Sequence, residues 1–148
     1  MKKLIILFII AALILAACAQ DKSPVGVATS VAQKYAAAVD ARSAKGYLAL
    51  FSDDAMYVDY GMHVGPVKMK ILANEVDSAF ADKNFAFKIK PSFVSEDGRF
   101  ATLQGDFSNM GHDGTVQTVP ALVVLEIKDG KIISEADYYD GEPYLIAR

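Results

Sequence analysis

The chain has 148 residues, of which 53% are apolar and 22% are charged, with one Cys and no Trp. This length and composition predict one domain with a buried core and exclude intrinsically disordered and disulfide-rich proteins. The 15 basic and 18 acidic side chains give a net charge of −3. That balance argues against a nucleic-acid partner, because phosphates are held by a basic surface.

The N-terminus has the features of a secretory signal. Met1-Lys2-Lys3 is cationic, and residues 4–15 form an uninterrupted run of twelve apolar residues, which is short for a membrane span. The alternatives are a signal anchor or a buried core helix, but a core helix would carry a polar face, and this run has none. Residues 1–17 are therefore predicted to be a signal peptide.

The end of this segment, Leu15-Ala16-Ala17-Cys18, resembles the lipobox of bacterial lipoproteins. The resemblance implies cleavage before Cys18, a lipid anchor such as palmitate on that residue, and a location in the cell envelope. Ala19 is similar to the residue found in lipoproteins of the outer membrane, which would face the periplasm. The plainer alternative is that Cys18 is only a small residue in an apolar segment. As the sole Cys it has no partner for an intramolecular disulfide.

Cleavage would remove Lys2 and Lys3 and leave 13 basic against 18 acidic side chains, a net charge of −5. Residues 18–26 are predicted to form a lipidated polar tether, because charge, Ser and Pro together offer no packing face. The folded domain is then expected over 27–148. Between 27 and 39, apolar residues recur every three to four positions, which predicts an amphipathic helix of about four turns.

Two further helices are predicted. Ser43 is placed to cap a short helix whose buried side runs over 47–51, and the polar residues at 52–54 are expected to end it. Gly65-Pro66 is predicted to open a third helix, since Pro is tolerated at a first helical position. Its apolar face would lie between residues 71 and 80.

The rest of the chain predicts strands. Pro120 falls inside one of them and requires a bulge or an edge position, because it cannot donate to a ladder. Four strands in meander order, with no long helix between them, should pair antiparallel. Helices followed by such a sheet indicate an α+β fold in which the helices cover one sheet face. The predicted strands are 55–59, 85–90, 99–108, 116–127 and 131–139, with turns at 96–98, 109–114 and 128–130.

Carboxylates recur on these strands with a spacing of two, which places residues of one set on one face. Strands usually avoid Asp, so three Asp residues in a small sheet indicate a site. The alternative is that these residues form the solvated face of the sheet. The sets are Tyr57 with Asp59, Gln104 with Asp106, and Glu135 with Asp137 and Tyr139.

Two stretches carry a family resemblance. Residues 35–59, with Ala-Leu-Phe-Ser-Asp-Asp-Ala at 49–55, resemble the opening of the nuclear transport factor 2-like superfamily, particularly its ketosteroid isomerase and SnoaL-like branches. Residues 130–140 are similar to the ending of SnoaL-like proteins and limonene epoxide hydrolase. The resemblance implies a cone-shaped pocket between a curved antiparallel sheet and three N-terminal helices. It also implies a homodimer formed through the outer sheet face.

The resemblance further implies site roles. Tyr35 matches the ketosteroid isomerase tyrosine that donates to a developing oxyanion, and Asp59 matches its general base. Asp106 and Asp137 match the catalytic acids of limonene epoxide hydrolase, and Asp137 also matches the acid/base carboxylate of SnoaL-like cyclases. Substrate-binding positions are assigned to Tyr57, His63, Gln104 and Tyr139, with His63 at the pocket mouth.

The residue types themselves favour acid/base chemistry, independently of the family resemblance. A carboxylate in an apolar pocket is desolvated, which raises its pKa toward the working pH, and carboxylates that share a cavity titrate apart. A tyrosine there would donate to an oxygen that gains charge. No cofactor or metal is expected, because His63 and His112 lack zinc-site spacing and the chain has no phosphate loop or nucleophile elbow.

Two functions remain open. The first is a lipid-anchored protein whose pocket binds a small apolar molecule and performs Asp-based isomerase, cyclase or hydratase chemistry. The second is a non-catalytic binding or interaction module of the same fold. Leu122 and Gln104, which stand where related enzymes carry charged groups, favour the second, whereas the strand carboxylates favour the first.

Overall fold

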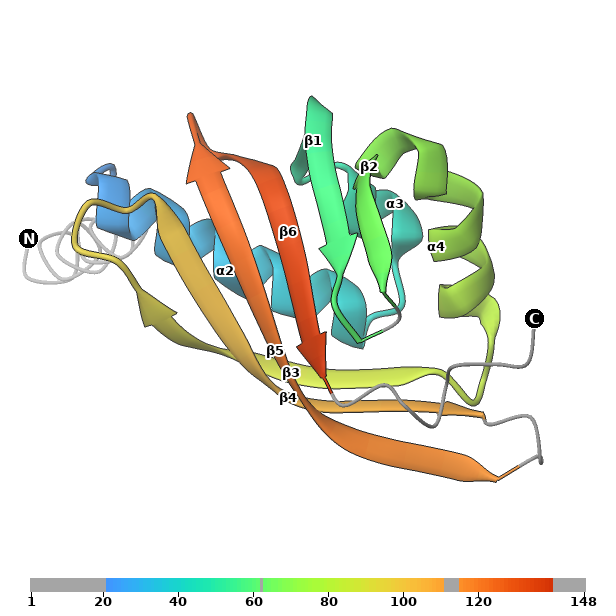
Figure 1. Ribbon diagram of the computed structural model, residues 1–148. Coiled ribbons are helices and arrows are strands. Elements are labelled where there is room, and N and C mark those ends of the chain that lie inside the picture. The colour runs from blue at the N-terminus through green and yellow to red at the C-terminus, as the bar shows by residue number, and fades with distance from the viewer. Residues whose placement is uncertain (1–20, 62, 111–114, 140–148) are drawn as a thin grey trace, which may run out of the picture.

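The computed structural model describes residues 21–61, 63–110 and 115–139 (Figure 1). Residues 1–17, Cys18, Ala19 and His112 lie outside these ranges. Among the residues described, no helix is both long and apolar enough to cross a membrane. The elements in chain order are α2 (Pro24–Asp40), α3 (Ala44–Leu48), β1 (Phe51–Asp59), β2 (Val64–Lys68), the 3-10 helix η1 (Met69–Leu72), α4 (Ala73–Ala81), β3 (Ala86–Val94), β4 (Phe100–Met110), β5 (Val116–Lys128) and β6 (Lys131–Tyr139).

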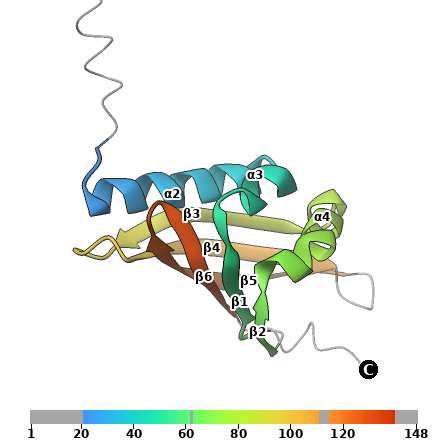
Figure 2. The same ribbon diagram turned by 90° about the horizontal axis from the view of Figure 1, so that it is seen from above.

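The strands form one curved, open sheet in the order β2-β1-β6-β5-β4-β3. The last four strands make the antiparallel meander that the sequence predicts, and β1 adds to β6 in parallel. Helices α2 and α3 lie along one face of the sheet, while α4 lies at its β1–β2 end (Figure 2). The α+β plan with helices over a curved sheet is therefore confirmed.

Helix α2 begins earlier than the apolar pattern indicates. The Ser23 side chain accepts a hydrogen bond from the backbone N–H of Gly26 at 3.0 Å, and Pro24 occupies the first turn. The Ser23 side chain thus satisfies the free backbone N–H of Gly26, while Pro24 has no N–H that needs a partner. The segment 18–26 predicted as a tether is therefore partly helical from Pro24 onward.

The polar residues at 52–54 do not end a helix. Helix α3 is capped by Ser43 as predicted, but it ends at Leu48, and the chain enters β1 at Phe51. Asp54 is exposed on this strand and forms an ion pair with Lys68 of β2 at 3.0 Å. The strand is therefore longer than the predicted 55–59.

Gly65-Pro66 does not open a helix either. Both residues lie in β2, the edge strand of the sheet, and the helical turns begin only at Met69. Proline is tolerated on an edge strand because its missing N–H faces no partner strand. Pro120 lies within β5, opposite Asp106 of β4, one residue before the first described β5–β6 pair, Ala121 with Tyr139.

Candidate functional site

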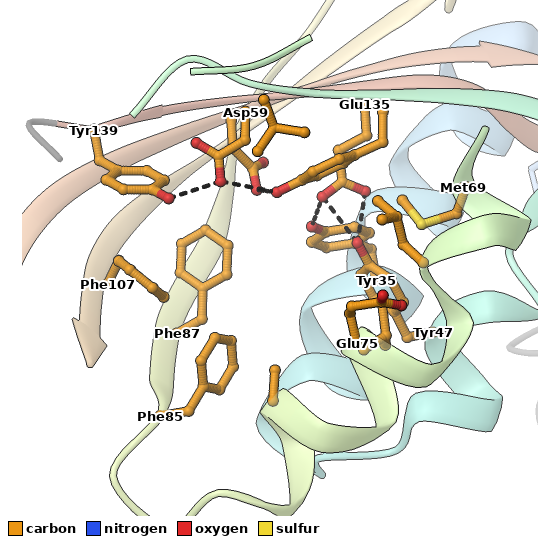
Figure 3. Close-up of a pocket in the computed structure, with 16 residues that line it drawn as sticks. Tyr35, Tyr47, Asp59, Met69, Glu75, Phe85, Phe87, Phe107, Glu135 and Tyr139 are labelled. Atoms are coloured by element: carbon orange, nitrogen blue, oxygen red, sulfur yellow. Dashed lines mark hydrogen bonds between the residues drawn. The ribbon is translucent and has the colours of Figure 1, made fainter. Parts of the chain in front are cut away.

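A cavity of about 280 Å³ lies between the inner face of the sheet and the helices (Figure 3). Most of its wall is apolar, with a group of hydroxyl and carboxyl side chains at the β1–β6 end. The lining residues are Tyr35, Tyr47, Tyr57, Asp59, Val64, Met69, Leu72, Glu75, Val76, Ala79, Phe85, Phe87, Phe107, Glu135, Asp137 and Tyr139.

The parallel pairing of β1 with β6 assembles the polar group. It aligns Tyr57 with Glu135 and Asp59 with Asp137. Because alternate residues share one face of a strand, all four side chains point to the same side of the sheet. Asp59 and Glu135 are each 1% exposed and Asp137 is 8% exposed. Three carboxyl groups thus lie away from water in one cavity.

Glu135 is held by two tyrosines from the helices. Tyr35 of α2 donates to its Oε1 at 2.7 Å, and Tyr47 of α3 lies 2.9 Å from Oε1 and 2.8 Å from Oε2. Burial raises the pKa of Glu135 to about 7, although the tyrosine hydrogen bonds favour the ionised form. Burial, followed by the charge of Glu135, also raises the pKa of both tyrosines, which keeps them as donors.

Asp59 and Asp137 are joined through Tyr57. The Tyr57 hydroxyl lies 3.1 Å from Oδ2 of each carboxyl group, and Tyr139 donates to Asp59 Oδ2 at 2.7 Å. A phenol has a single hydrogen, so Tyr57 donates to only one of the two. Both contacts are hydrogen bonds only when one carboxyl group is protonated.

Asp137 is the group that fits this requirement. Its pKa is raised well above the usual range, first by burial and then by the charges of Glu135 and Asp59. Its Oδ1 atom is buried without a hydrogen-bond partner among the residues described. The arrangement therefore places a neutral acid, Asp137, beside an acceptor, Asp59, that receives hydrogen bonds from two tyrosines.

Five of the predicted site residues meet in this cavity, namely Tyr35, Tyr57, Asp59, Asp137 and Tyr139. His63, Gln104 and Asp106 do not. His63 is exposed in the connection after β1, where its φ is 54°. Leu103 and Phe107 of β4 are buried on the inner face of the sheet. Because side chains alternate along a strand, Gln104 and Asp106 lie on the opposite, exposed face and do not line the cavity. The prediction that His63, Gln104 and Asp106 share one site with Asp59 is therefore corrected.

Three polar residues of the cavity, Tyr47, Glu75 and Glu135, were given no site role from the sequence. Glu135 stands two residues before Asp137, so strand alternation already carried the signal that it shares the same face. Tyr47 had only the signal of a buried position on a short helix, and its contact with Glu135 spans 88 positions. The aromatic wall formed by Phe85, Phe87 and Phe107 likewise depends on the packing of β3 against β4.

The chain is similar to a known protein family. Residues 32–135 match the family described as the SnoaL-like domain. The chain belongs to the SnoaL-like domain family. The match spans most of the described fold, from α2 to Glu135, and thus includes Tyr35, Tyr57 and Asp59 of the cavity. No curated protein matches the chain at a significant level.

Solved structures share the fold of this SnoaL-like protein at low sequence identity. A hypothetical protein from Catenulispora acidiphila with a ketosteroid isomerase-like fold, in complex with trimethylamine, is 20% identical with a TM-score of 0.62, covering 78% of this chain and 88% of that one. An LEH-like epoxide hydrolase from M. tuberculosis is 17% identical, with a TM-score of 0.61 and coverages of 79% and 85%. A nuclear transport factor 2-like protein from Burkholderia thailandensis is 13% identical, with a TM-score of 0.64 and coverages of 79% and 93%.

Proposed function

We propose that this SnoaL-like domain binds a small, largely apolar molecule in its cavity and transfers a proton to or from it. The observation that carries the proposal is the shared Tyr57 hydroxyl, 3.1 Å from both Asp59 and Asp137. One hydrogen cannot serve both contacts, so an acid and a proton acceptor stand side by side. Both face an apolar cavity, where proton transfer between substrate and protein does not compete with water.

In this proposal Asp59 Oδ2 removes a proton from a carbon next to a carbonyl group. Asp137 gives its proton to the carbonyl oxygen as that oxygen gains charge. Asp59 is then protonated and Asp137 is ionised. The hydroxyl of Tyr57 resets the pair by accepting a proton from Asp59 while it passes its own to Asp137. The reaction class is enolisation, as used in isomerisation or cyclisation.

The first test is hydrogen exchange of simple ketones in D₂O, followed by proton NMR. Cyclohexanone and 2-tetralone should exchange their α-hydrogens faster with the protein than in buffer. Asp59→Asn should lower the protein-dependent rate by about a hundredfold or more, the usual contribution of a general base.

Asp106→Asn supplies the matched control, because it makes the same change on an exposed strand position outside the cavity. That variant should exchange the ketones at the parent rate. Exchange that survives Asp59→Asn would contradict the assigned base. Absence of protein-dependent exchange for both ketones would instead favour the non-catalytic binding module.

We also propose that the domain is anchored in the cell envelope by a lipid on Cys18. The proposal rests on the cationic start, the apolar run at 4–15 and the lipobox-like ending. Only six residue steps separate Cys18 from the start of α2 at Pro24, a reach of about 20 Å when fully extended. The end of the domain at the start of α2 would therefore lie close to the membrane surface.

Cys18→Ala is expected to remove the anchor. In cells of the native host fed a clickable palmitate analogue, the parent protein should carry the label and sediment with membranes. The variant should be unlabelled and leave the membrane fraction. A labelled variant, or a parent protein without label, would contradict lipidation at this residue.

A further inference from the structure

The charge of the cavity wall is one-sided. Asp59, Glu135 and Asp137 are buried in it, and Glu75 of α4 adds an exposed fourth carboxyl group. Among the residues described, the lining contains no Lys, Arg or His. Buried acidic groups are ordinarily paired with a positive charge or hydrogen-bonded until they are satisfied. Here the protein supplies tyrosines but no cation.

One atom in this wall lacks a partner. Asp137 Oδ1 is buried and receives no hydrogen bond from a hydroxyl or N–H donor in the described part of the chain, and its carboxyl neighbour is Glu135, whereas both oxygens of Glu135 accept from tyrosines. An unsatisfied buried carboxyl oxygen is uncommon in folded proteins and indicates a missing ligand or solvent group. The positive charge of a cation that enters the cavity would be attracted to this oxygen.

The opposite part of the wall is aromatic. Phe107 contacts Phe85, Phe87 and Tyr139, with ring centroids 5.5, 5.8 and 4.9 Å away. In Figure 3 the rings of Phe85 and Phe87 face the space below the Asp59 group. Aromatic faces attract ammonium groups through their quadrupoles, and the attraction increases when the cation is desolvated.

We propose that the ligand of this cavity is a small organic cation, an alkylated ammonium group that lies between the aromatic wall and the Asp59–Asp137 pair. The inference rests on the proposed function, because it names the ligand class for the same cavity. A volume of about 280 Å³ is at the lower end for ligand pockets and fits a compact ammonium compound. Carboxylate and phosphate ligands are disfavoured, since the described lining holds four acids and no basic group.

A pair of probes with the same shape tests the charge. Choline and 3,3-dimethyl-1-butanol differ in the replacement of the quaternary nitrogen by carbon, so only the first is a cation. By calorimetry on the full-length protein, choline should bind about tenfold more tightly than the alcohol or better. Asp59→Asn, which replaces the carboxyl group that accepts from two tyrosines by an amide, should weaken choline by about tenfold or more and change the alcohol by less than about twofold.

Two further variants keep the test decisive. Phe87→Leu removes an aromatic face without changing charge and should weaken choline more than the alcohol, which covers the case in which Asp59→Asn does not fold. Asp106→Asn, outside the cavity, should bind both probes as the parent does. Equal affinity for the two probes, tighter binding of the alcohol, or binding of neither would overturn the cation assignment. Ketone exchange reports separately on the proposed proton transfer.

Discussion

Raising the pH from 5 to 8 is expected to lower the free energy of unfolding by about 2.5 kcal/mol through Glu135 alone. Burial lifts the pKa of this group from 4.5 to about 7 in the folded protein. Between those values the folded protein holds a proton that the unfolded chain has released. Each increase in pH therefore favours unfolding until the group ionises in both states.

Asp137 acts in the same direction, because its pKa is also raised by burial and by the neighbouring carboxylates. The exposed acids whose pKa is lowered, such as Asp54 beside Lys68, ionise below this window and add no slope within it. Stability should thus be greatest near pH 5 and decline toward pH 8. In proteins whose acidic groups form surface ion pairs, stability instead falls as the pH is lowered into the acid range.

Urea unfolding at pH 5, 6, 7 and 8 measures this slope. Glu135→Gln should flatten it and should be more stable than the parent protein at pH 8, since the amide needs no proton to remain neutral. Asp54→Asn is the matched control and should keep the parent slope. A stability that is constant or rises between pH 5 and 8 would show that the buried acids are ionised without penalty.

Gly105→Ala is expected to destabilise the fold by about 3 kcal/mol or more. Gly105 lies in β4, paired with Ile89 of β3 and Ala121 of β5. A Cβ at this position would overlap the carbonyl oxygen of Lys88 in the backbone of the neighbouring strand. A backbone atom cannot rotate away as a side chain can, so the β3–β4 ladder would have to separate at this point.

Gly65→Ala provides the comparison, because a Cβ at Gly65 in β2 would have no atom within 4 Å. That variant should unfold within about 0.5 kcal/mol of the parent protein, as is usual for surface substitutions. Both changes add the same methyl group to a strand glycine. Equal losses of stability in urea would contradict the close approach of the two strands at Gly105.

The sequence predicts the parts of this molecule that depend on local pattern. Strand alternation places Asp137 and Tyr139 on one face, and Asp129-Gly130 closes the β5–β6 hairpin as expected, with φ of 51° and 74°. Alternation does not say by itself which face of β4 is inward. The apolar residues 101, 103 and 107 have the parity opposite to Gln104 and Asp106, and they are the ones that are buried.

Other features depend on contacts between distant residues. The parallel pairing of β1 with β6 brings Asp59 beside Asp137, 78 positions later in the chain, and no local pattern specifies it. Gly65-Pro66 fits either the first turn of a helix or an edge strand, and only the position of β2 in the sheet decides between them. Tyr35 and Tyr47, which donate to Glu135, lie on α2 and α3, and the positions of these helices against the sheet depend on packing between distant residues.

The central claim is that Glu135 and Asp137 hold protons near neutral pH. Carbon NMR titration of the Asp and Glu carboxyl signals tests it most directly, with Asp59→Asn, Glu135→Gln and Asp137→Asn to assign the cavity resonances. The account predicts that Glu135 titrates near pH 7 and that Asp137 titrates well above its ordinary value. Midpoints below about 5 for both groups, near those of free side chains, would contradict it.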